Sequence, residues 1–265
     1  FGGRMQRSET QVSVQKLPVD GYTETASIMA YGYNPFLTSW SPYHGAAYAV
    51  VEACAKAVAA GAEFGGMRFS YQEYFERMHT ARSWGKPLAA LLGALRMQVE
   101  LGLPSIGGKD SMSGTFQQIN VPPMLMAFGI TTVDARRVIS TDLKEAGHTL
   151  YLLKHTPKAN RMPDTAALRT LWNYASERIA AGRIVAGYAV GFGGVAEALA
   201  KMAFGNRIGA EVTTDESRLY EYAYGSILVE SDGELDFPAA ELLGETVADE
   251  VLTVNGVRMP LDGLY

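Results

Sequence analysis

Cysteine is almost absent from this chain of 265 residues. Cys54 is the only one, so no disulfide can form within the chain and a cysteine-rich zinc site is excluded. Because free cysteine is among the most buried residue types and Cys54 lies in an alanine-rich helical run, we expect it in the core. The histidines show no metal-ligand spacing either, and they are His44, His79, His148 and His155.

Long hydrophobic runs and an excess of positive charge are also missing. No apolar run has the length of a membrane span, and the chain does not start with a secretory signal. The net charge of −5 argues against a nucleic-acid surface or an anionic membrane as the main partner. Together with a hydrophobic content of 48%, these features predict a globular cytoplasmic protein without a nucleic-acid or membrane partner.

Strand and helix patterns alternate in both halves of the chain, which predicts α+β or α/β layers in two subdomains. We place the boundary near 145, with an N-terminal α+β subdomain over 1–145 and a C-terminal α/β subdomain over 146–265. The expected helices cover 46–60, 86–101, 165–180 and 195–204, the second with Leu88, Leu91, Leu92, Leu95 and Val99 on one face. The expected strands cover 9–19, 64–70, 124–133, 149–154, 184–194, 208–213, 225–231 and 249–254.

The most informative stretch is Gly-Gly-Lys-Asp-Ser-Met-Ser over 107–113. Its two glycines let the backbone approach a ligand closely, and a cation, an anion and two hydroxyls follow at once. An apolar run before it, 101–106, predicts a buried strand, so a rigid scaffold would hold the polar residues. Such residues suit an anionic, phosphorylated ligand. The alternative is an ordinary Gly-Gly turn with an exposed ion pair between Lys109 and Asp110.

The stretch is not the common phosphate-binding loop, because Leu103 stands where that motif requires its first glycine. A second glycine-rich turn, 191–194, joins a predicted strand to a helix, where an anion could bind. It carries no acid, base or metal ligand, so we favour a packing role there. Arg68 and Ser70 could reach a phosphate. Glu52 is either a metal-binding carboxylate or half of a surface pair with Lys56.

Three segments together resemble the large form of phosphoribosylformylglycinamidine synthase, the formylglycinamide ribonucleotide amidotransferase family. The run Leu-Pro-Ser-Ile-Gly-Gly-Lys-Asp-Ser-Met-Ser over 103–113 is the most specific of them. The helix over 46–61 is similar to that family's helix with a metal-binding glutamate, and 185–204 is similar to its glycine turn and helix. Order and spacing fit from about residue 4 to 230.

The resemblance implies the second half of a synthetase region with an aminoimidazole-ribonucleotide-synthetase-like fold, in which an N-terminal piece pairs into a barrel. It implies a carbon–nitrogen ligase of purine biosynthesis that uses ATP, Mg²⁺ and glutamine. ATP would activate the formyl amide, and ammonia would displace phosphate. Expected partners are the first half and the glutaminase domain, neither of which lies in this chain. We expect the chain alone to be inactive and able to pair with a second copy.

The resemblance also implies roles for single residues. Lys109 and Asp110 would be catalytic, while Ser111, Ser113 and Arg68 would bind the phosphorylated substrate. The nucleotide would contact Gly107, Gly108 and Ser70, and Glu52 would bind Mg²⁺. Several expected ligands are replaced. Lys56 stands in place of an asparagine, the expected aspartate and serine are missing from 188–194, and the expected N-terminal aspartate is matched only by Asp20-Gly21.

In that family one of two nucleotide sites is catalytic and the other structural, so these losses suggest that the structural site has decayed here, while 107–113 still serves the catalytic one. Two alternatives therefore remain beside a catalytic half. The chain could be a non-catalytic structural half that supports the rest of the enzyme. It could also belong to another branch of the same ATP-binding superfamily, such as the aminoimidazole ribonucleotide, selenophosphate or thiamine-phosphate enzymes. The Lys-Asp-Ser-Met-Ser string counts against that branch.

Overall fold

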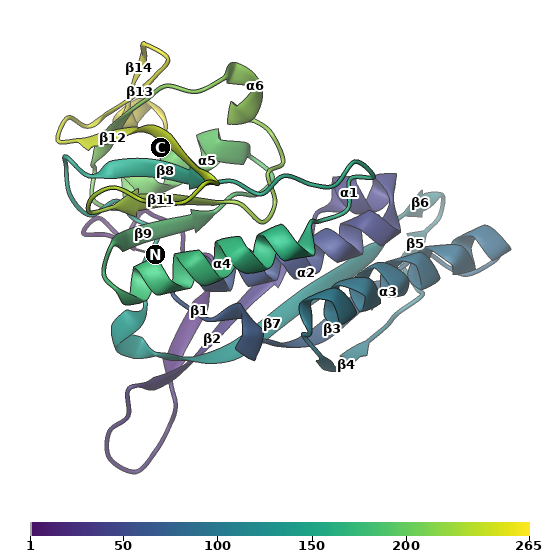
Figure 1. Cartoon of the computed structure of the whole chain (residues 1–265). Coiled ribbons are helices and arrows are strands. Elements are labelled where there is room, and N and C mark those ends of the chain that lie inside the picture. Colours follow the sequence, from purple (N-terminus) through teal and green to yellow (C-terminus); the bar gives the residue numbers. More distant parts are fainter. Residues whose placement is uncertain (1) are drawn as a thin grey trace.

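The computed structural model describes residues 2–265, and its two large sheets come from different halves of the chain (Figure 1). The first sheet has the order β1-β2-β7-β3-β4. Its strands are β1 (Ser13–Lys16), β2 (Thr25–Gly32), β3 (Arg68–Tyr74), β4 (Ser105–Lys109) and β7 (Met124–Asp134). Strands β2, β3 and β4 run in one direction, because β2 and β3 are both antiparallel to β7 and β3 is parallel to β4.

The second sheet has the order β14-β13-β10-β12-β8-β11-β9, and most of its pairings are antiparallel. Its strands are β8 (Thr149–Leu153), β9 (Ile184–Ala189), β10 (Gly209–Val212), β11 (Ile227–Ser231), β12 (Ala240–Val247), β13 (Val251–Val254) and β14 (Val257–Pro260). The short strands β5 (Thr115–Phe116) and β6 (Ile119–Asn120) form a separate hairpin. The mixed α+β layers confirm the predicted fold class.

Helix α2 (Pro42–Ala59) lies between the two sheets and forms the centre of the molecule. The Ser41 hydroxyl caps its first turn by accepting a hydrogen bond from the amide of His44. Pro42 suits the first helical position because it has no N–H group that would need a partner there. Its many alanines let neighbours approach closely on every side. At Gly187 of β9, a Cβ would lie 2.6 Å from the Ala59 carbonyl oxygen, so only glycine fits there. Cys54 is fully buried in this helix, as predicted.

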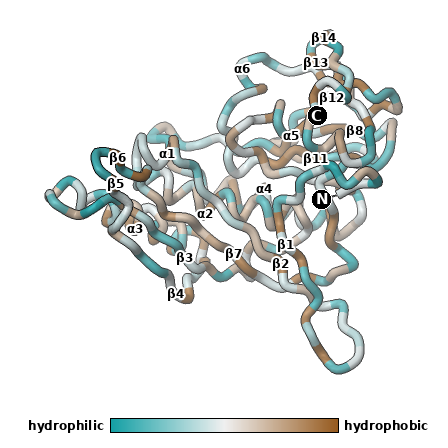
Figure 2. Tube along the Cα trace, turned by 180° about the vertical axis from the view of Figure 1, so that it is seen from behind, coloured by the Kyte–Doolittle hydropathy of each residue, from teal (hydrophilic) through white to brown (hydrophobic). Residues whose placement is uncertain are grey.

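Helices cover only one face of the first sheet. Alternate residues of β2, such as Ala26, Ile28 and Ala30, face α2 and are buried. Their neighbours Met29 and Tyr31 lie on the opposite face and are 43% and 51% exposed. Strand β7, which is hydrophobic along much of its length (Figure 2), adds Ile130 beside Met29 on that uncovered face. We call Met29, Tyr31, Phe128 and Ile130 the open sheet face.

Helix α3 (Ala81–Leu101) starts before the predicted residue 86 and ends at the predicted residue 101, where Gly102 caps it with a φ of 70°. It packs on α2 through small residues such as Gly93 and Ala94, together with Met97. The predicted leucine stripe lies on the other side and is exposed to solvent; its members are Leu88, Leu91, Leu92, Leu95 and Val99. The regular apolar spacing therefore predicted the helix correctly, but the face it marked is exposed and the small residues on the opposite face are buried.

The remaining helices are α1 (Pro35–Trp40), α4 (Thr165–Ala180), α5 (Gly194–Phe204) and α6 (Glu216–Leu219), with single 3₁₀ turns at Phe64–Gly66, Ala135–Arg137 and Leu261–Gly263. The bounds of α4 match the predicted ones, and Asp164 caps it through the amides of Ala166 and Ala167. The N-terminal segment is attached to the second half, because Gln11 exchanges two hydrogen bonds with the backbone of Ala189 at 2.9 and 2.7 Å.

The structure differs from the predicted elements in several places. Strand β2 was not predicted, although its residues alternate as a half-buried strand should. Strands β12 and β14 were also missed, and the strand expected over 64–70 begins at Arg68. The buried strand expected before the glycines is wrong. Strand β4 contains the glycines, and all its residues are exposed because it forms an edge of the sheet.

No helix within residues 2–265 has the length and apolar character needed to cross a membrane.

Candidate functional site

The glycine-rich stretch is fastened to the sheet through its backbone. The amide of Ser111 donates to the Glu73 carbonyl at 3.1 Å, and the amide of Phe75 donates to the Ser111 carbonyl at 2.9 Å. Three residues after Ser111, the amide of Gly114 donates to the Phe75 carbonyl at 2.8 Å. The segment after β4 therefore continues the pairing with β3, and its side chains extend from a fixed backbone.

Gly108 occupies a position that has no room for a larger residue. It lies opposite Tyr71 in the parallel pairing of β4 with β3. A Cβ at Gly108 would lie 2.8 Å from the Tyr71 carbonyl oxygen, which is backbone and cannot move aside easily. A Cβ at the neighbouring Gly107 would meet nothing within 4 Å. The first glycine therefore leaves open space beside the strand, and the second lets the two strands approach.

Lys109 and Asp110 are exposed and do not pair. No ion pair within residues 2–265 joins them to each other, so the alternative of a simple exposed Lys109–Asp110 pair is not what the structure has. The hydroxyls of Ser111 and Ser113 lie 3.0 Å apart and share a hydrogen bond. These four side chains give one short segment a cation, an anion and two hydroxyls that can turn toward a ligand.

A groove of about 490 Å³ runs between β4 and helix α3. One wall carries apolar side chains of α3, including Leu91, Leu92 and Leu95, and the other is the backbone from Gly107 to Asp110. The exposed side of the leucine stripe thus borders the glycine-rich segment. A ligand with an apolar part and a polar part would find both kinds of contact here.

Glu73 is a site residue that the sequence reasoning missed. It lines the same groove, it is only 5% exposed, and its Oε1 atom has no hydrogen-bond partner among residues 2–265. Burial, with a smaller contribution from the charge of Asp110, raises the pKa of Glu73 to about 7. The signal was present, because Phe69, Tyr71 and Glu73 alternate on the buried face of β3. A carboxyl group that changes protonation near neutral pH is suited to proton transfer.

Arg68 and Ser70 lie on the face of β3 opposite Glu73, and neither lines the groove. Arg68 begins β3, and its guanidinium donates back to the carbonyls of Gly66 and Met67 at 3.2 and 2.9 Å. Five residues of extended chain separate it from Glu73, which is a distance of about 17 Å. Ser70 lies opposite Gly107 in the pairing and is nearer the glycines. The structure therefore places Ser70 next to Gly107 in the sheet, on the face away from the groove, and leaves Arg68 at the other end of the strand.

Glu52 lies on α2 at a separate position, near the end of β2. Its Oε2 atom accepts from the amide of Tyr33 at 3.0 Å, and its Oε1 atom is 2.8 Å from the ammonium of Lys56. Burial raises the pKa of Glu52, while the Lys56 ammonium and the Tyr33 amide oppose that rise. Both side chains are only 12% exposed. The pair is thus mostly buried, unlike the surface pair considered from the sequence.

The residues around Glu52 do not fit a bound Mg²⁺ ion. Lys56 also donates to the Tyr31 carbonyl at 2.9 Å, so its ammonium lies between the two oxygens that a metal would use. Among residues 2–265, no three side chains of His, Cys, Asp or Glu gather as a metal site.

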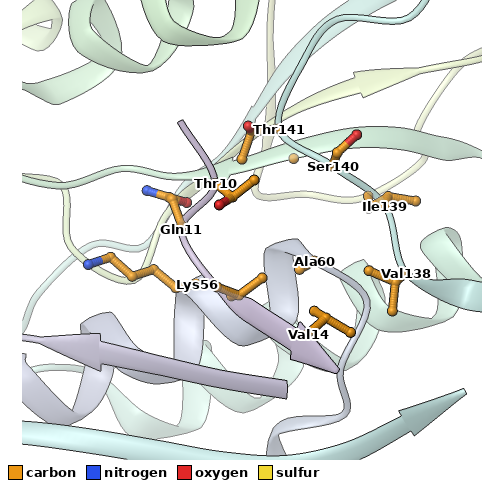
Figure 3. A pocket seen from close by; sticks show the side chains of 11 residues that line it. Thr10, Gln11, Val14, Lys56, Ala60, Val138, Ile139, Ser140 and Thr141 are labelled. Atoms are coloured by element: carbon orange, nitrogen blue, oxygen red, sulfur yellow. The ribbon is translucent and has the colours of Figure 1, made fainter. Parts of the chain in front are cut away.

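Lys56 also lines a cavity of about 380 Å³ beside the N-terminal segment, and in Figure 3 its side chain and that of Gln11 extend toward the same side.

The second glycine-rich turn satisfies its own polar groups. The amide of Gly193 donates to the Glu197 carboxylate at 2.9 Å, and that carboxylate also pairs with Lys201 at 2.7 Å. The ring of Phe192 stacks on Phe36 with 5.3 Å between the ring centroids. The turn is therefore occupied by contacts within the protein, in keeping with the predicted packing role.

Comparisons with known proteins identify the fold. No protein-family model matches the chain, and no curated protein matches it. Among solved structures, PurLQS from Thermotoga maritima matches with a TM-score of 0.75 and 14% identity, over 97% of this chain and 47% of that chain. T. maritima PurL complexed with FGAR matches with a TM-score of 0.73 and 14% identity, over 98% of this chain and 48% of that one.

A shorter protein has the same fold. AaThiL complexed with AMPPCP and TMP matches with a TM-score of 0.67 and 13% identity, over 97% of this chain and 90% of that chain. The present chain thus spans about half the length of the PurL structures and nearly the whole length of ThiL. The fold of this chain is the aminoimidazole-ribonucleotide-synthetase-like fold that PurL and ThiL share.

Proposed function

We propose that the chain is the second half of the synthetase region of a formylglycinamide ribonucleotide amidotransferase. The reaction would consume formylglycinamide ribonucleotide, ATP and glutamine and yield the amidine. The observation that carries the proposal is the segment 107–113, which combines a fixed backbone, two hydroxyls and a lysine that has no ion-pair partner among residues 2–265. The fold supports it, since T. maritima PurL, which has this fold, is complexed with FGAR in a solved structure.

Within this proposal, the residues of the glycine-rich segment act on the phosphorylated substrate. Ser111 and Ser113 would donate hydrogen bonds to its anionic oxygens, and the Lys109 ammonium would stabilise charge on the phosphoryl group in transfer. Gly107 and Gly108, with Ser70 beside them, would leave room for the nucleotide. Asp110 and Glu73 would accept or return a proton as ammonia adds. We assign no metal to Glu52, so the Mg²⁺ that accompanies ATP would need ligands from the partner half.

The open sheet face is the proposed contact with the first half of the enzyme. Met29, Tyr31 and Ile130 are large apolar side chains, and each is more than two-fifths exposed. A related half with the same sheet would cover them by pairing face to face. In its absence, a second copy of this chain offers the same surface. The glutaminase domain would be a further partner, because a source of ammonia is required.

The test is turnover by the complete enzyme. Lys109→Ala together with Ser111→Ala should lower kcat/KM for formylglycinamide ribonucleotide by about 100-fold or more, the usual loss when a transition-state contact is removed. Phe116→Ala is the matched control, since Phe116 is 72% exposed in the adjoining hairpin and should not matter. Near-normal turnover of the double variant would support the second candidate, a structural half without catalytic groups. That candidate is supported by the carboxylates of Glu52 and Glu197, which are bound by Lys56 and by the Gly193 amide of the protein itself.

A further inference from the structure

The ammonium of Lys56 has the surroundings of a bound cation. It lies 2.8 Å from the Glu52 carboxylate, 2.9 Å from the Tyr31 carbonyl oxygen, and 4.6 Å from the centre of the Tyr31 ring. A carboxylate and a backbone carbonyl are the oxygen ligands that Mg²⁺ and Mn²⁺ use. Because the Glu52 carboxylate is mostly buried, it needs a positive charge beside it. Lys56 supplies that charge from one turn along the same helix.

The carboxylate of Glu197 has, in turn, the surroundings of a bound anion. It accepts from the amide of Gly193 at the start of α5, where a helix offers free N–H groups to phosphate. The ammonium of Lys201 neutralises it at 2.7 Å. In the same turn, the ring of Phe192 stacks on Phe36. The Gly193 amide is therefore already bound by a carboxylate of the protein itself.

We propose that Lys56 takes the place of a metal ion beside Glu52, and that Glu197 takes the place of a phosphate group at the start of α5, so that the wild-type chain is stable without either ligand. Removing Lys56 would then expose a divalent-cation site made by Glu52 and the Tyr31 carbonyl. This goes beyond the proposed function, because it concerns a second place on the chain and holds whether or not the glycine-rich segment binds substrate.

The experiment measures Mn²⁺ binding to the 265-residue chain by electron paramagnetic resonance, and the melting temperature with Mn²⁺ or with EDTA. Wild type should bind no Mn²⁺ at this place. Lys56→Ala and Lys56→Asn should bind one Mn²⁺ ion about tenfold more tightly than any residual site of wild type. Their melting temperature should be low in EDTA and rise by several degrees in Mn²⁺, because the ion binds only the folded chain.

Lys86→Ala is the matched control, since Lys86 also forms an ion pair, with Glu76 at 2.7 Å, on a different helix. It should show no rise in melting temperature with Mn²⁺. Folded Lys56 variants that bind no Mn²⁺, or wild type that binds it equally well, would overturn the proposal.

A double variant keeps the test decisive if the single variants do not fold. Glu52→Gln with Lys56→Met removes both charges and keeps both side-chain shapes. A folded double variant without Mn²⁺ binding would show that Lys56 is needed only to balance Glu52, as proposed. A double variant that is as unstable as Lys56→Ala would contradict the proposal, because Lys56 would then serve the fold in some other way.

Discussion

Phe75 and Ser111 are joined through their backbones, with the Phe75 amide donating to the Ser111 carbonyl at 2.9 Å. The contact lies beyond the last paired residues of β3 and β4, so it extends the sheet into the glycine-rich segment. The serine and lysine side chains are thus held by a strand edge and do not depend on a free loop. A site of this kind is prepared before its ligand arrives, which lowers the entropy lost on binding.

Gly108→Ala should disrupt this arrangement. The new Cβ would lie 2.8 Å from the Tyr71 carbonyl oxygen, so β4 must move away from β3. We expect a loss of about 1–3 kcal/mol in the free energy of unfolding, measured by urea denaturation. Gly65→Ala is the control, because its Cβ would meet nothing within 4 Å. Equal stability of the two variants would show that the strands are not held as tightly as described.

Glu73→Gln should change how stability depends on pH. Burial raises the pKa of Glu73 in the folded chain from the usual 4.5 to about 7, so the folded state favours the protonated carboxyl. The stabilisation is complete below the unfolded value and is lost as the pH rises through the folded value. Glutamine cannot lose a proton. The variant should therefore gain on the order of 1–3 kcal/mol relative to wild type between about pH 5 and about pH 8.

Urea denaturation at the two pH values measures the Glu73 effect. Glu76→Gln is a suitable control, because the Glu76 carboxylate is paired with Lys86 at 2.7 Å and is not left without a partner. The difference in the free energy of unfolding between Glu73→Gln and wild type should depend on pH. Any difference caused by Glu76→Gln should not change with pH in the same way. A constant difference for Glu73→Gln would mean that its carboxyl titrates normally.

Glu230→Ala should be among the most destabilising changes in the second half. Glu230 is fully buried and accepts from the amides of Lys144 and Glu145 at 2.7 and 3.1 Å, and its Oε1 atom lies 2.7 Å from His148 Nδ1. Removing the carboxylate leaves these part-buried donors without a partner and a cavity where the buried side chain was, which together cost about 3–5 kcal/mol. Thermal unfolding measures the loss, with the exposed Glu234→Ala as the control. A small loss would show that water replaces the carboxylate easily.

Ile130→Lys should prevent self-association through the open sheet face. Ile130 pairs with Met29 across β7 and β2, so a lysine there places a charge at the centre of the apolar face. We expect wild type to show a dimer in sedimentation equilibrium and Ile130→Lys to be monomeric with unchanged stability. Val257→Lys, at a 62% exposed position in β14, is the control and should leave the dimer intact. Wild type that stays monomeric at high concentration would contradict a role of this face in pairing with a like half.

Prediction from the sequence was most accurate for helix α4, in which the local pattern and the burial agree. Helix α4 has an N-terminal cap and a regular apolar face, and its predicted bounds match. Helix α3 was found through its leucines, although small residues such as Gly93 make its actual contact with α2. Small residues carry little hydropathy, so a period alone could not show which face is buried. Strand β4 was expected inside the sheet, and only the pairing order reveals that it is an edge.

The candidate site was predicted in part for a similar reason. The segment 107–113 was identified from its residue types, which need no tertiary information. The burial of Glu73 depends on how α3 covers β3, and the pairing of Lys56 with the Tyr31 carbonyl depends on where β2 meets α2. Both require contacts between segments far apart in the chain. Residue chemistry therefore indicated the kind of site, and the fold decided which side chains have partners.

The most direct test of the central claim is a crystal structure of the complete enzyme with formylglycinamide ribonucleotide bound. The account predicts the phosphorylated substrate within hydrogen-bonding distance of the Ser111 and Ser113 hydroxyls and beside Gly107 and Gly108. A substrate bound elsewhere, with these hydroxyls and the Lys109 ammonium facing solvent, would contradict it.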